Sequence, residues 1–386
     1  MKSISLLFPL ICKFFNFKIN NKLSNISLKR FSSKGDYKKN KFLENSTKKI
    51  GFHERNHFGT SYDIPSIVFT CPELENYLKR IKETDEISID FSEQKAVKLL
   101  NRGLLFNRYN LKYWDFPEGY LIPPIPGRAE YIHHIADLIS ENSEDGELLL
   151  GGRVRGLDIG TGSTLIYPLI GHLEYGWHFT GADIDLQALK SADKIISENS
   201  KVLSTDSIKL CYQKDPNNVF KNIFRHKNEK FVFSMCNPPF HSSMAASFAG
   251  TERKWRGLGR EDKIADKLPP LNTTTDINVE SRGNHVLNFG GGELELSCKG
   301  GEVGFIKTMI DESSIDSVRN RVKWFTCIVS KKTNMVILKK YINNIKPYGA
   351  RPIEVREIDM SVGNKKFQFL AWTYTNLNAK SFMDSS

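Results

Sequence analysis

Long hydrophobic runs and closely paired cysteines are both missing from this sequence of 386 residues. No apolar run approaches the roughly 18–20 residues of a membrane-spanning helix, which argues against an integral membrane protein. The six cysteines are scattered without a C-x-x-C pair, so we expect neither a disulfide framework nor a zinc ribbon, and a reducing compartment fits. With 40% hydrophobic and 26% charged residues, the chain is not wholly disordered and has room for one large or two smaller globular units.

Acidic residues are absent from the first 35 positions, where seven Lys or Arg alternate with apolar residues, Ser and Asn. Residues 1–50 carry twelve basic and two acidic side chains, whereas the other 336 residues carry 43 Lys and Arg against 42 Asp and Glu. The net charge of +11 therefore belongs mainly to a basic tail. This composition is typical of an organelle transit peptide, and Arg30-Phe31-Ser32-Ser33 resembles a matrix-protease cleavage site. The alternatives are a disordered basic arm that aids RNA binding, or a protein of the cytoplasm, nucleus or nucleolus.

Short strand patterns alternate with helical patterns over residues 151–386. This rhythm predicts an α/β fold with a doubly wound, mostly parallel sheet, and a ligand crevice beyond the carboxyl ends of its central strands. Residues 51–150 mix helical and strand patterns, which predicts an α+β extension, and residues 260–287 are polar and aperiodic, which predicts a mobile loop. The expected strands are 154–159, 177–184, 208–212, 231–235, 323–329 and 367–374, with residues 331–342 between the last two, and the expected helices include 93–106, 128–140 and 186–198.

A glycine turn follows the first expected strand. It reads Asp158-Ile159-Gly160-Thr161-Gly162-Ser163-Thr164, and its glycines allow the backbone to pass close to a ligand. Leu165 replaces the third glycine of a dinucleotide fingerprint, and the Lys-Ser/Thr of a phosphate-binding loop is missing. An acid directly before G-x-G suits S-adenosylmethionine, whose ribose hydroxyls would be accepted by Asp183 or Asp185 at the end of the second strand. Taken alone, the motif also fits an ordinary strand–helix turn.

The second motif is Asn237-Pro238-Pro239-Phe240, directly after the fourth expected strand. The prolines fix the backbone and end the strand. An exocyclic amine on a planar base is a poor nucleophile, because its lone pair is delocalised into the ring. The Asn237 side-chain oxygen and the Pro238 carbonyl could accept its two N–H groups, and Phe240 could stack on the flipped base. The two motifs together predict a methyltransferase that works by positioning and electrostatics.

These motifs and several others resemble the RlmF family, bacterial adenine-N6 methyltransferases of large-subunit ribosomal RNA. The likeness spans about residues 52–376. A human adenine-N6 methyltransferase of spliceosomal small nuclear RNA is a more distant relative that shares the glycine turn, Tyr-Pro-Leu and Asn-Pro-Pro-Phe. The segments that carry the resemblance are 128–134, 157–160, 166–171, 236–241, 250–254, 287–291, 300–303 and 324–326.

The resemblance implies a Rossmann-like class I methyltransferase domain with S-adenosylmethionine as donor and one adenosine of structured RNA as acceptor. Residues 51–150 would then form an RNA-binding or lid segment. The basic tail and the longer 260–287 segment depart from the bacterial pattern. These differences put the position of the methylated adenosine in question more than the catalysis. Carried over by motif, the cofactor-binding residues are Arg128, Asp158, Gly160, Gly162, Thr164 and Asp183, and the catalytic residues are Asn237, Pro238 and Phe240.

A basic cluster with one aromatic side chain follows the catalytic turn and is the candidate for substrate RNA; the alternative is a solvated charged loop. His133-His134 invites a metal, but neighbouring residues on a helix point in different directions and no third ligand has suitable spacing, so we expect none. Cys236 lacks a base partner and is expected to be a small buried side chain. The members of the basic cluster are Arg253, Lys254, Trp255 and Arg256.

We therefore expect a monomeric ribosomal-RNA adenine-N6 methyltransferase that contacts no membrane. Its substrate would be large-subunit ribosomal RNA, either free or within a pre-ribosomal particle, since the body of the protein is nearly neutral. The enzymatic alternatives are the same chemistry on a small nuclear RNA adenosine, on guanine N2 or on a protein glutamine. The alternative of another class is an RNA-binding or assembly protein without turnover.

The interpretation of the tail is open to a direct test. Residues 1–31 fused to a fluorescent protein should carry it into mitochondria, because an acid-poor amphipathic leader is read by the import machinery. Microscopy of that fusion, beside one in which the basic residues of the tail are changed to Gln, measures the effect. A diffuse cytosolic signal would discard the targeting interpretation.

Overall fold

The computed structural model describes residues 51–59, 62–81, 85–141, 147–226, 228–242, 291–345 and 350–385. These residues belong to one compact unit that runs from Lys48 to Ser386. The basic tail, the 260–287 segment and the cluster Arg253, Lys254, Trp255 and Arg256 lie outside the described residues, and their roles stay predictions. Among the described helices, none has both the length and the apolar character needed to cross a membrane.

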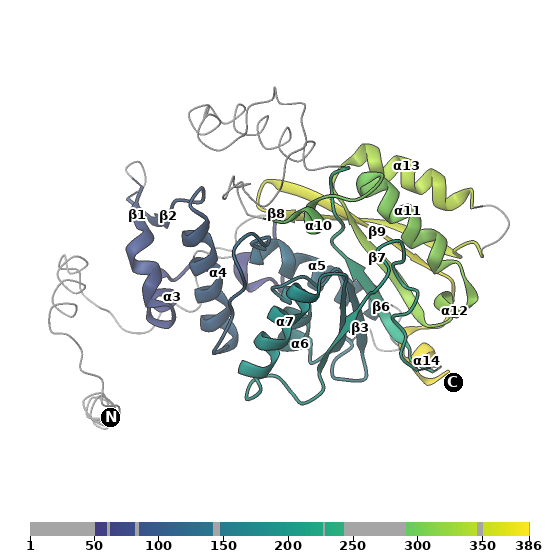
Figure 1. Cartoon of the computed structure of the whole chain (residues 1–386), viewed down its shortest axis with the longest axis horizontal. Helices are drawn as coiled ribbons and strands as arrows, with labels where there is room; N and C mark the ends of the chain where they lie inside the picture. Colours follow the sequence, from purple (N-terminus) through teal and green to yellow (C-terminus); the bar gives the residue numbers. More distant parts are fainter. Residues whose placement is uncertain are drawn as a thin grey trace. The chain divides into compact units, whose positions relative to one another are not determined.

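A seven-stranded sheet runs through the unit in the order β5-β4-β3-β6-β7-β9-β8 (Figure 1). The five strands from β5 to β7 are parallel, whereas β9 runs antiparallel to both of its neighbours. This arrangement confirms the predicted α/β fold with a mainly parallel sheet. The strands are β3 (Arg155–Ile159), β4 (His178–Asp183), β5 (Ile208–Tyr212), β6 (Phe231–Cys236), β7 (Val322–Val329), β8 (Glu354–Val362) and β9 (Lys365–Thr373).

Helices cover both faces of the sheet, because side chains alternate along each strand and both sets are apolar. On β7, Trp324 and Ile328 belong to one hydrophobic core, and Phe325 and Cys327 belong to the other. The first core includes α5 (Ile125–Ser140), α6 (Ile166–Tyr175) and α7 (Leu186–Glu198). The second includes α11 (Gly301–Ser313) and α13 (Lys332–Asn343). Two short helices, α12 (Asp316–Arg319) and α14 (Ala379–Asp384), follow in the C-terminal part.

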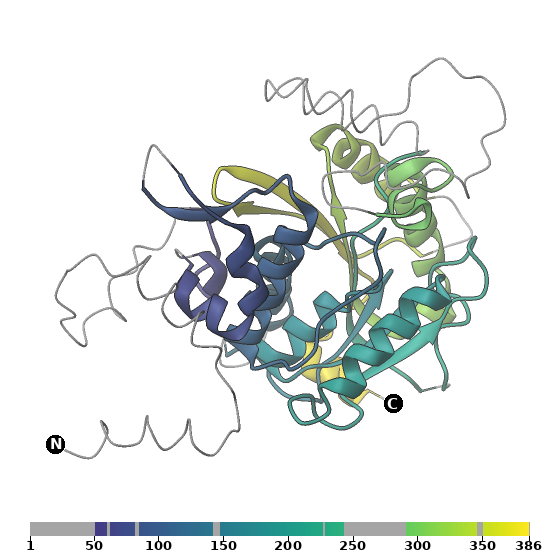
Figure 2. The ribbon, with the colours of Figure 1, turned by 60° about the vertical axis from the view of Figure 1, so that its left-hand side comes forward.

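The N-terminal part of the unit is the predicted α+β extension, seen in purple and blue in Figure 2. It is fastened to the glycine turn and to the C-terminal end of α7. Trp114 donates its indole N–H to the Thr164 carbonyl at 3.0 Å, and the buried Asn199 amide accepts from the Lys112 and Tyr113 N–H groups. Its elements are η1 (His57–Gly59), α3 (Ile64–Thr70), η2 (Pro72–Tyr77), β1 (Leu78–Arg80), β2 (Ile87–Ile89) and α4 (Gln94–Tyr109).

Several elements differ from the expectation, and three of them are informative. Strand β8 was missed; it forms the edge of the sheet, and four of its nine residues are charged. Helix α3 was not expected; Asp63 caps it and Pro65 sits in its first turn, where a missing N–H costs nothing. For the same reason α5 begins at Ile125, with Pro126 in its first turn, whereas the expected helix started at residue 128.

Candidate functional site

A cavity of about 350 Å³ lies at the carboxyl ends of β3, β4 and β6, where the fold predicts a ligand crevice. Four of the predicted site residues share its wall: Gly160, Gly162, Asp183 and Asn237. The other predicted residues, Arg128, Asp158, Thr164, Pro238 and Phe240, do not line it. The lining residues that sequence reasoning missed include Gln213, Asn217, Asn218, Glu295, Cys298 and Lys299.

The glycine turn adopts a conformation that explains its composition. Gly160 and Gly162 have φ of 71° and 67°, in the left-handed region where a Cβ is unfavourable. No atom lies within 4 Å of the position a Cβ would take on Gly160, so conformation rather than crowding requires glycine there. Leu165, at the place of a third fingerprint glycine, is itself left-handed with φ of 53°. The turn is therefore strained at a non-glycine residue beside the cavity.

Asp183 is fixed against this turn. Its two carboxylate oxygens accept the Gly162 N–H at 2.8 Å and the Asp185 N–H at 2.9 Å. Burial raises the pKa of Asp183, and the charge of Asp185 adds to the rise. Asp185 has different partners, since it caps α7 through the Gln187 N–H and accepts the Tyr120 hydroxyl at 2.6 Å. Asp183 is thus the carboxylate joined to the glycine turn, in keeping with its predicted role at a ribose.

Asp158 and Arg128 each keep a buried polar atom without a hydrogen-bond partner among the described residues. Asp158 is fully buried and neither of its oxygens has a hydrogen-bond partner among the described residues; the neighbouring Thr161 hydroxyl does not reach hydrogen-bonding geometry. Arg128 binds the Tyr167 hydroxyl at 2.7 Å and leaves its buried Nε unpartnered. Burial, with a smaller contribution from Asp183, raises the pKa of Asp158 to about 7. An orphaned carboxylate and an orphaned guanidinium N–H fit a zwitterion, such as the amino-acid end of S-adenosylmethionine.

The Asn237-Pro238-Pro239-Phe240 turn is held by the chain that returns beside it. Asn237 and Pro239 reach the cavity wall, whereas Pro238 is buried and Phe240 packs half-buried against the core. His241 donates its N–H to the Leu296 carbonyl at 3.0 Å and accepts the Cys298 N–H at 3.0 Å. This backbone bridge fixes the position of the turn. The stacking role of Phe240 stays a prediction.

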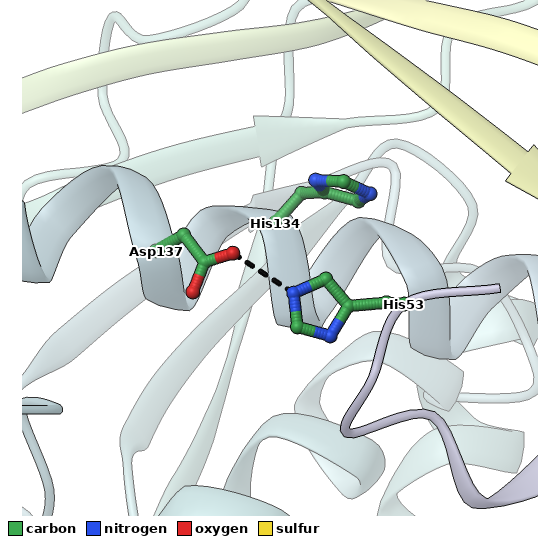
Figure 3. Close-up of side chains that lie close together, drawn as sticks. All are labelled: His53, His134 and Asp137. Carbon is green, nitrogen blue, oxygen red and sulfur yellow. Dashed lines mark hydrogen bonds and ion pairs between the residues drawn. The ribbon is translucent and has the colours of Figure 1, made fainter.

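His53 forms a polar cluster with His134 and Asp137 of α5 (Figure 3). The ring nitrogens and carboxylate oxygens that could bind a metal lie within 4.8 Å of one another. Sequence spacing did not reveal this third partner for His134, because His53 comes from a distant segment. The His53 ring is already engaged, since Nδ1 accepts the Arg55 N–H and Nε2 binds Asp137 at 2.8 Å. The Arg55 guanidinium binds the other Asp137 oxygen and opposes a second cation there. The cluster anchors residues 53–56 to α5.

The buried Asp158 generates a prediction about stability and pH. An unfolded Asp binds a proton only below about pH 4, whereas the folded group keeps its proton up to about pH 7. The contribution of this carboxyl to folding stability therefore falls as pH rises from 4 to 7, and then levels off. The substitution Asp158→Asn removes this dependence. The free energy of unfolding of the variant, relative to that of the wild type, should therefore be higher at pH 8 than at pH 4 by roughly 2–4 kcal/mol. Urea unfolding at both pH values measures the gain, and a pH-independent difference would contradict the assignment.

Comparison with known proteins gives the site its context. Residues 46–376 match a protein family described as RNA methyltransferase. Ribosomal RNA large subunit methyltransferase F of Citrobacter koseri is 44% identical over 329 residues, which cover 85% of this chain and 95% of that protein. The enzyme of the same name from Photobacterium profundum is 42% identical over 339 residues, covering 87% of this chain and 94% of that protein.

Solved structures show the same architecture. The catalytic domain of human METTL16 in complex with the MAT2A 3′UTR hairpin 6 is 25% identical with a TM-score of 0.62, and the match covers 84% of this chain and 98% of that domain. The N-terminal domain of human METTL16 in complex with S-adenosylhomocysteine is 25% identical with a TM-score of 0.59, covering 84% and 99%. The family match, the relatives above 40% identity and the cavity at the glycine turn agree. This chain belongs to the RNA methyltransferase family, with S-adenosylmethionine as its methyl donor.

Proposed function

We propose that this protein transfers a methyl group from S-adenosylmethionine to N6 of one adenosine in large-subunit ribosomal RNA. The observation that carries the proposal is the placement of Asn237 on the same cavity wall as Gly160, Gly162 and Asp183. An acceptor for an exocyclic amine thus faces the turn that would hold the donor. The relatives named for large-subunit ribosomal RNA support the choice of substrate.

The residues behind the turn would hold the donor. Arg128 suits the carboxylate of the amino-acid end, and Asp158 suits its ammonium group, which would offset the cost of that buried carboxylate. Asp183 suits the ribose hydroxyls, and Thr164 is buried where the glycine turn leads into α6. The bound donor supplies a methyl group on a sulfonium, which is reactive enough to need no activation by the protein.

The catalytic turn then has to position and polarise the adenine amine. The Asn237 side-chain oxygen and the Pro238 carbonyl would each accept one N–H of the amine, which draws the nitrogen lone pair out of the ring and toward the methyl group. Two consecutive prolines and the bridge between His241 and residues 296–298 keep these acceptors in place, so little reorganisation is needed during the reaction. The proton leaves after transfer, when the amine has become cationic and acidic.

The substrate and the compartment belong to the same proposal. Because the body of the protein carries almost equal numbers of basic and acidic residues, non-specific attraction to naked RNA is weak, which favours a ribosomal RNA already bound to proteins. The cluster Arg253, Lys254, Trp255 and Arg256 is the proposed contact to that RNA, and the basic tail is proposed to direct the protein to mitochondria. We take the acting species to be a monomer.

Asn237→Ala tests the assigned catalytic role. The variant should lose methyl transfer almost completely, while its affinity for S-adenosylmethionine stays within about threefold of the wild type, because the amide serves the acceptor and not the donor. Single-turnover transfer and calorimetry measure the two effects, with Asn343→Ala on the exposed side of α13 as the matched control. Equal loss of donor binding in the Asn237 variant would assign the amide to the cofactor instead.

The substrate is tested with labelled S-adenosylmethionine and ribosomal RNA from mitochondrial and cytosolic ribosomes, presented separately, both naked and as subunits. Digestion to nucleosides should give labelled N6-methyladenosine from large-subunit RNA of the mitochondrial sample. N6-methyladenosine from cytosolic RNA alone would contradict the proposed mitochondrial location and assign the substrate to the cytosolic ribosome. Labelled methylguanosine, or label found only in protein, would overturn the proposed acceptor while keeping the donor.

A further inference from the structure

A third carboxylate faces the cavity beside the two aspartates. Glu295 lies on the short helix α10 (Glu293–Leu296), and its Oε2 accepts the Leu121 N–H at 2.9 Å and the Gly292 N–H at 3.2 Å. Its Oε1 lies 3.8 Å from the position that a Cβ would take on Gly162, and within the described part of the chain it receives no hydrogen bond. One oxygen of Glu295 is thus fixed by the protein, and the other is available to a ligand at the glycine turn.

The wall of the cavity has an excess of negative charge. Asp183, Asp185 and Glu295 line it, whereas Lys299 is the one basic residue among its described lining residues. Burial raises the pKa of Glu295 to about 7, and the charges of Asp183 and Asp185 contribute to the rise. Three ionised carboxylates therefore coexist only with difficulty in the protein alone, and a cation beside Glu295 would remove that difficulty.

Three neighbouring titratable groups, Tyr120, Cys298 and Arg128, do not supply this cation. The Tyr120 hydroxyl, which binds Asp185, and the Cys298 thiol both have raised pKa values caused chiefly by burial, so both are neutral near pH 7. Arg128 is engaged with Tyr167 behind the glycine turn and does not line the cavity. Lys299 is a cation on the same wall, but a single lysine leaves the three carboxylates in excess, so a cationic ligand would supply the remaining positive charge.

The methyl donor and its product differ in the charge on their sulfur atom. S-adenosylmethionine carries a sulfonium in addition to its zwitterionic end and has a net charge of +1, whereas S-adenosylhomocysteine has a neutral sulfur and no net charge. Both offer the same ribose, adenine and amino-acid groups. A carboxylate near the sulfur therefore changes the affinity for the donor and leaves the affinity for the product nearly unchanged.

We propose that Glu295 selects the methyl donor over its spent product by charge, and that a charged donor thereby strengthens the hold of Glu295 on the cavity wall. The inference rests on the S-adenosylmethionine-dependent activity proposed above. The wall concerned is residues 119–121, which the Glu295 carboxylate holds through Leu121 and which is also tied by the Gly291 N–H to the Gly119 carbonyl at 3.0 Å. A carboxylate that is fully ionised accepts the Leu121 N–H more strongly than a protonated one.

Binding of three ligands to the full chain tests the selection without any RNA. The probes are S-adenosylmethionine, sinefungin, which carries an ammonium in place of the sulfonium methyl, and S-adenosylhomocysteine. In calorimetry at pH 8, Glu295→Gln should weaken the two cationic ligands by about tenfold and the neutral product by no more than about twofold. Glu198→Gln, an exposed Glu on α7 outside the cavity, is the matched control and should change none of the three.

Two further measurements report on the protonation of Glu295 and on the cavity wall formed by residues 119–121. Near pH 7, donor binding should release a fraction of a proton, seen as a dependence of the calorimetric heat on the buffer, and the product should release much less. The Leu121 amide should exchange more slowly with the donor bound than with the product bound, and this difference should vanish in the Glu295→Gln protein. Melting temperatures show whether that variant remains folded.

Equal losses for donor and product in the Glu295→Gln protein would overturn the proposal and make the residue a neutral contact. Unchanged affinities for all three ligands would overturn it as well. The outcome is separable from the proposed function. A protein that discriminates by charge but labels no ribosomal RNA would support the role of Glu295 and contradict the proposed substrate. Conversely, methylation of the expected nucleoside with no preference for the charged donor would support the proposed substrate and contradict the role of Glu295.

Discussion

The register of β3 between β4 and β6 is the constraint on which the site depends. Ile159, the last residue of β3, pairs with Ala182 on one side and with Cys236 on the other. The residues that follow these strands therefore emerge next to each other, which brings Gly160, Asp183 and Asn237 to one edge although they are far apart in sequence. A slip of one residue would turn each strand's side chains to the opposite face, and both faces of this sheet are buried. Two packed cores thus secure the register, and the register assembles the site.

The site also holds charge that the fold alone does not balance. Asp158 is buried without a hydrogen bond, Arg128 keeps an unpartnered Nε, and Glu295 is crowded by two other carboxylates. Such groups cost stability in the ligand-free protein and are stabilised by a ligand of complementary charge. The protein therefore keeps its polar groups fixed before the ligand arrives, in the way that electrostatic preorganisation requires.

Local patterns were enough to predict the elements that place the motifs. The helix 186–198 was predicted with its observed bounds, since Asp185 caps it and its apolar residues repeat at helical spacing. Strand β8 was missed because it lies at the edge and four of its nine residues are charged. At the site, the glycine turn, Asp183 and Asn237 could be found from sequence because each directly follows a strand. Glu295 could not, since its contact to Leu121 joins residues 174 positions apart and follows from no local pattern. The anchor formed by His53 and Asp137 was missed for the same reason.

The bridge between His241 and Ser297 has a consequence for how this enzyme can vary. The chain leaves the catalytic turn after residue 242 and is back beside it by residue 296, so both ends of the intervening stretch are fixed at one point. Lengthening a connection between two fixed ends costs little free energy, because loop-closure entropy grows only slowly with length. Residues can thus be added or removed between residues 242 and 291 without moving Asn237 or Glu295. The scaffold separates a part that is free to diversify from a part that must keep its geometry.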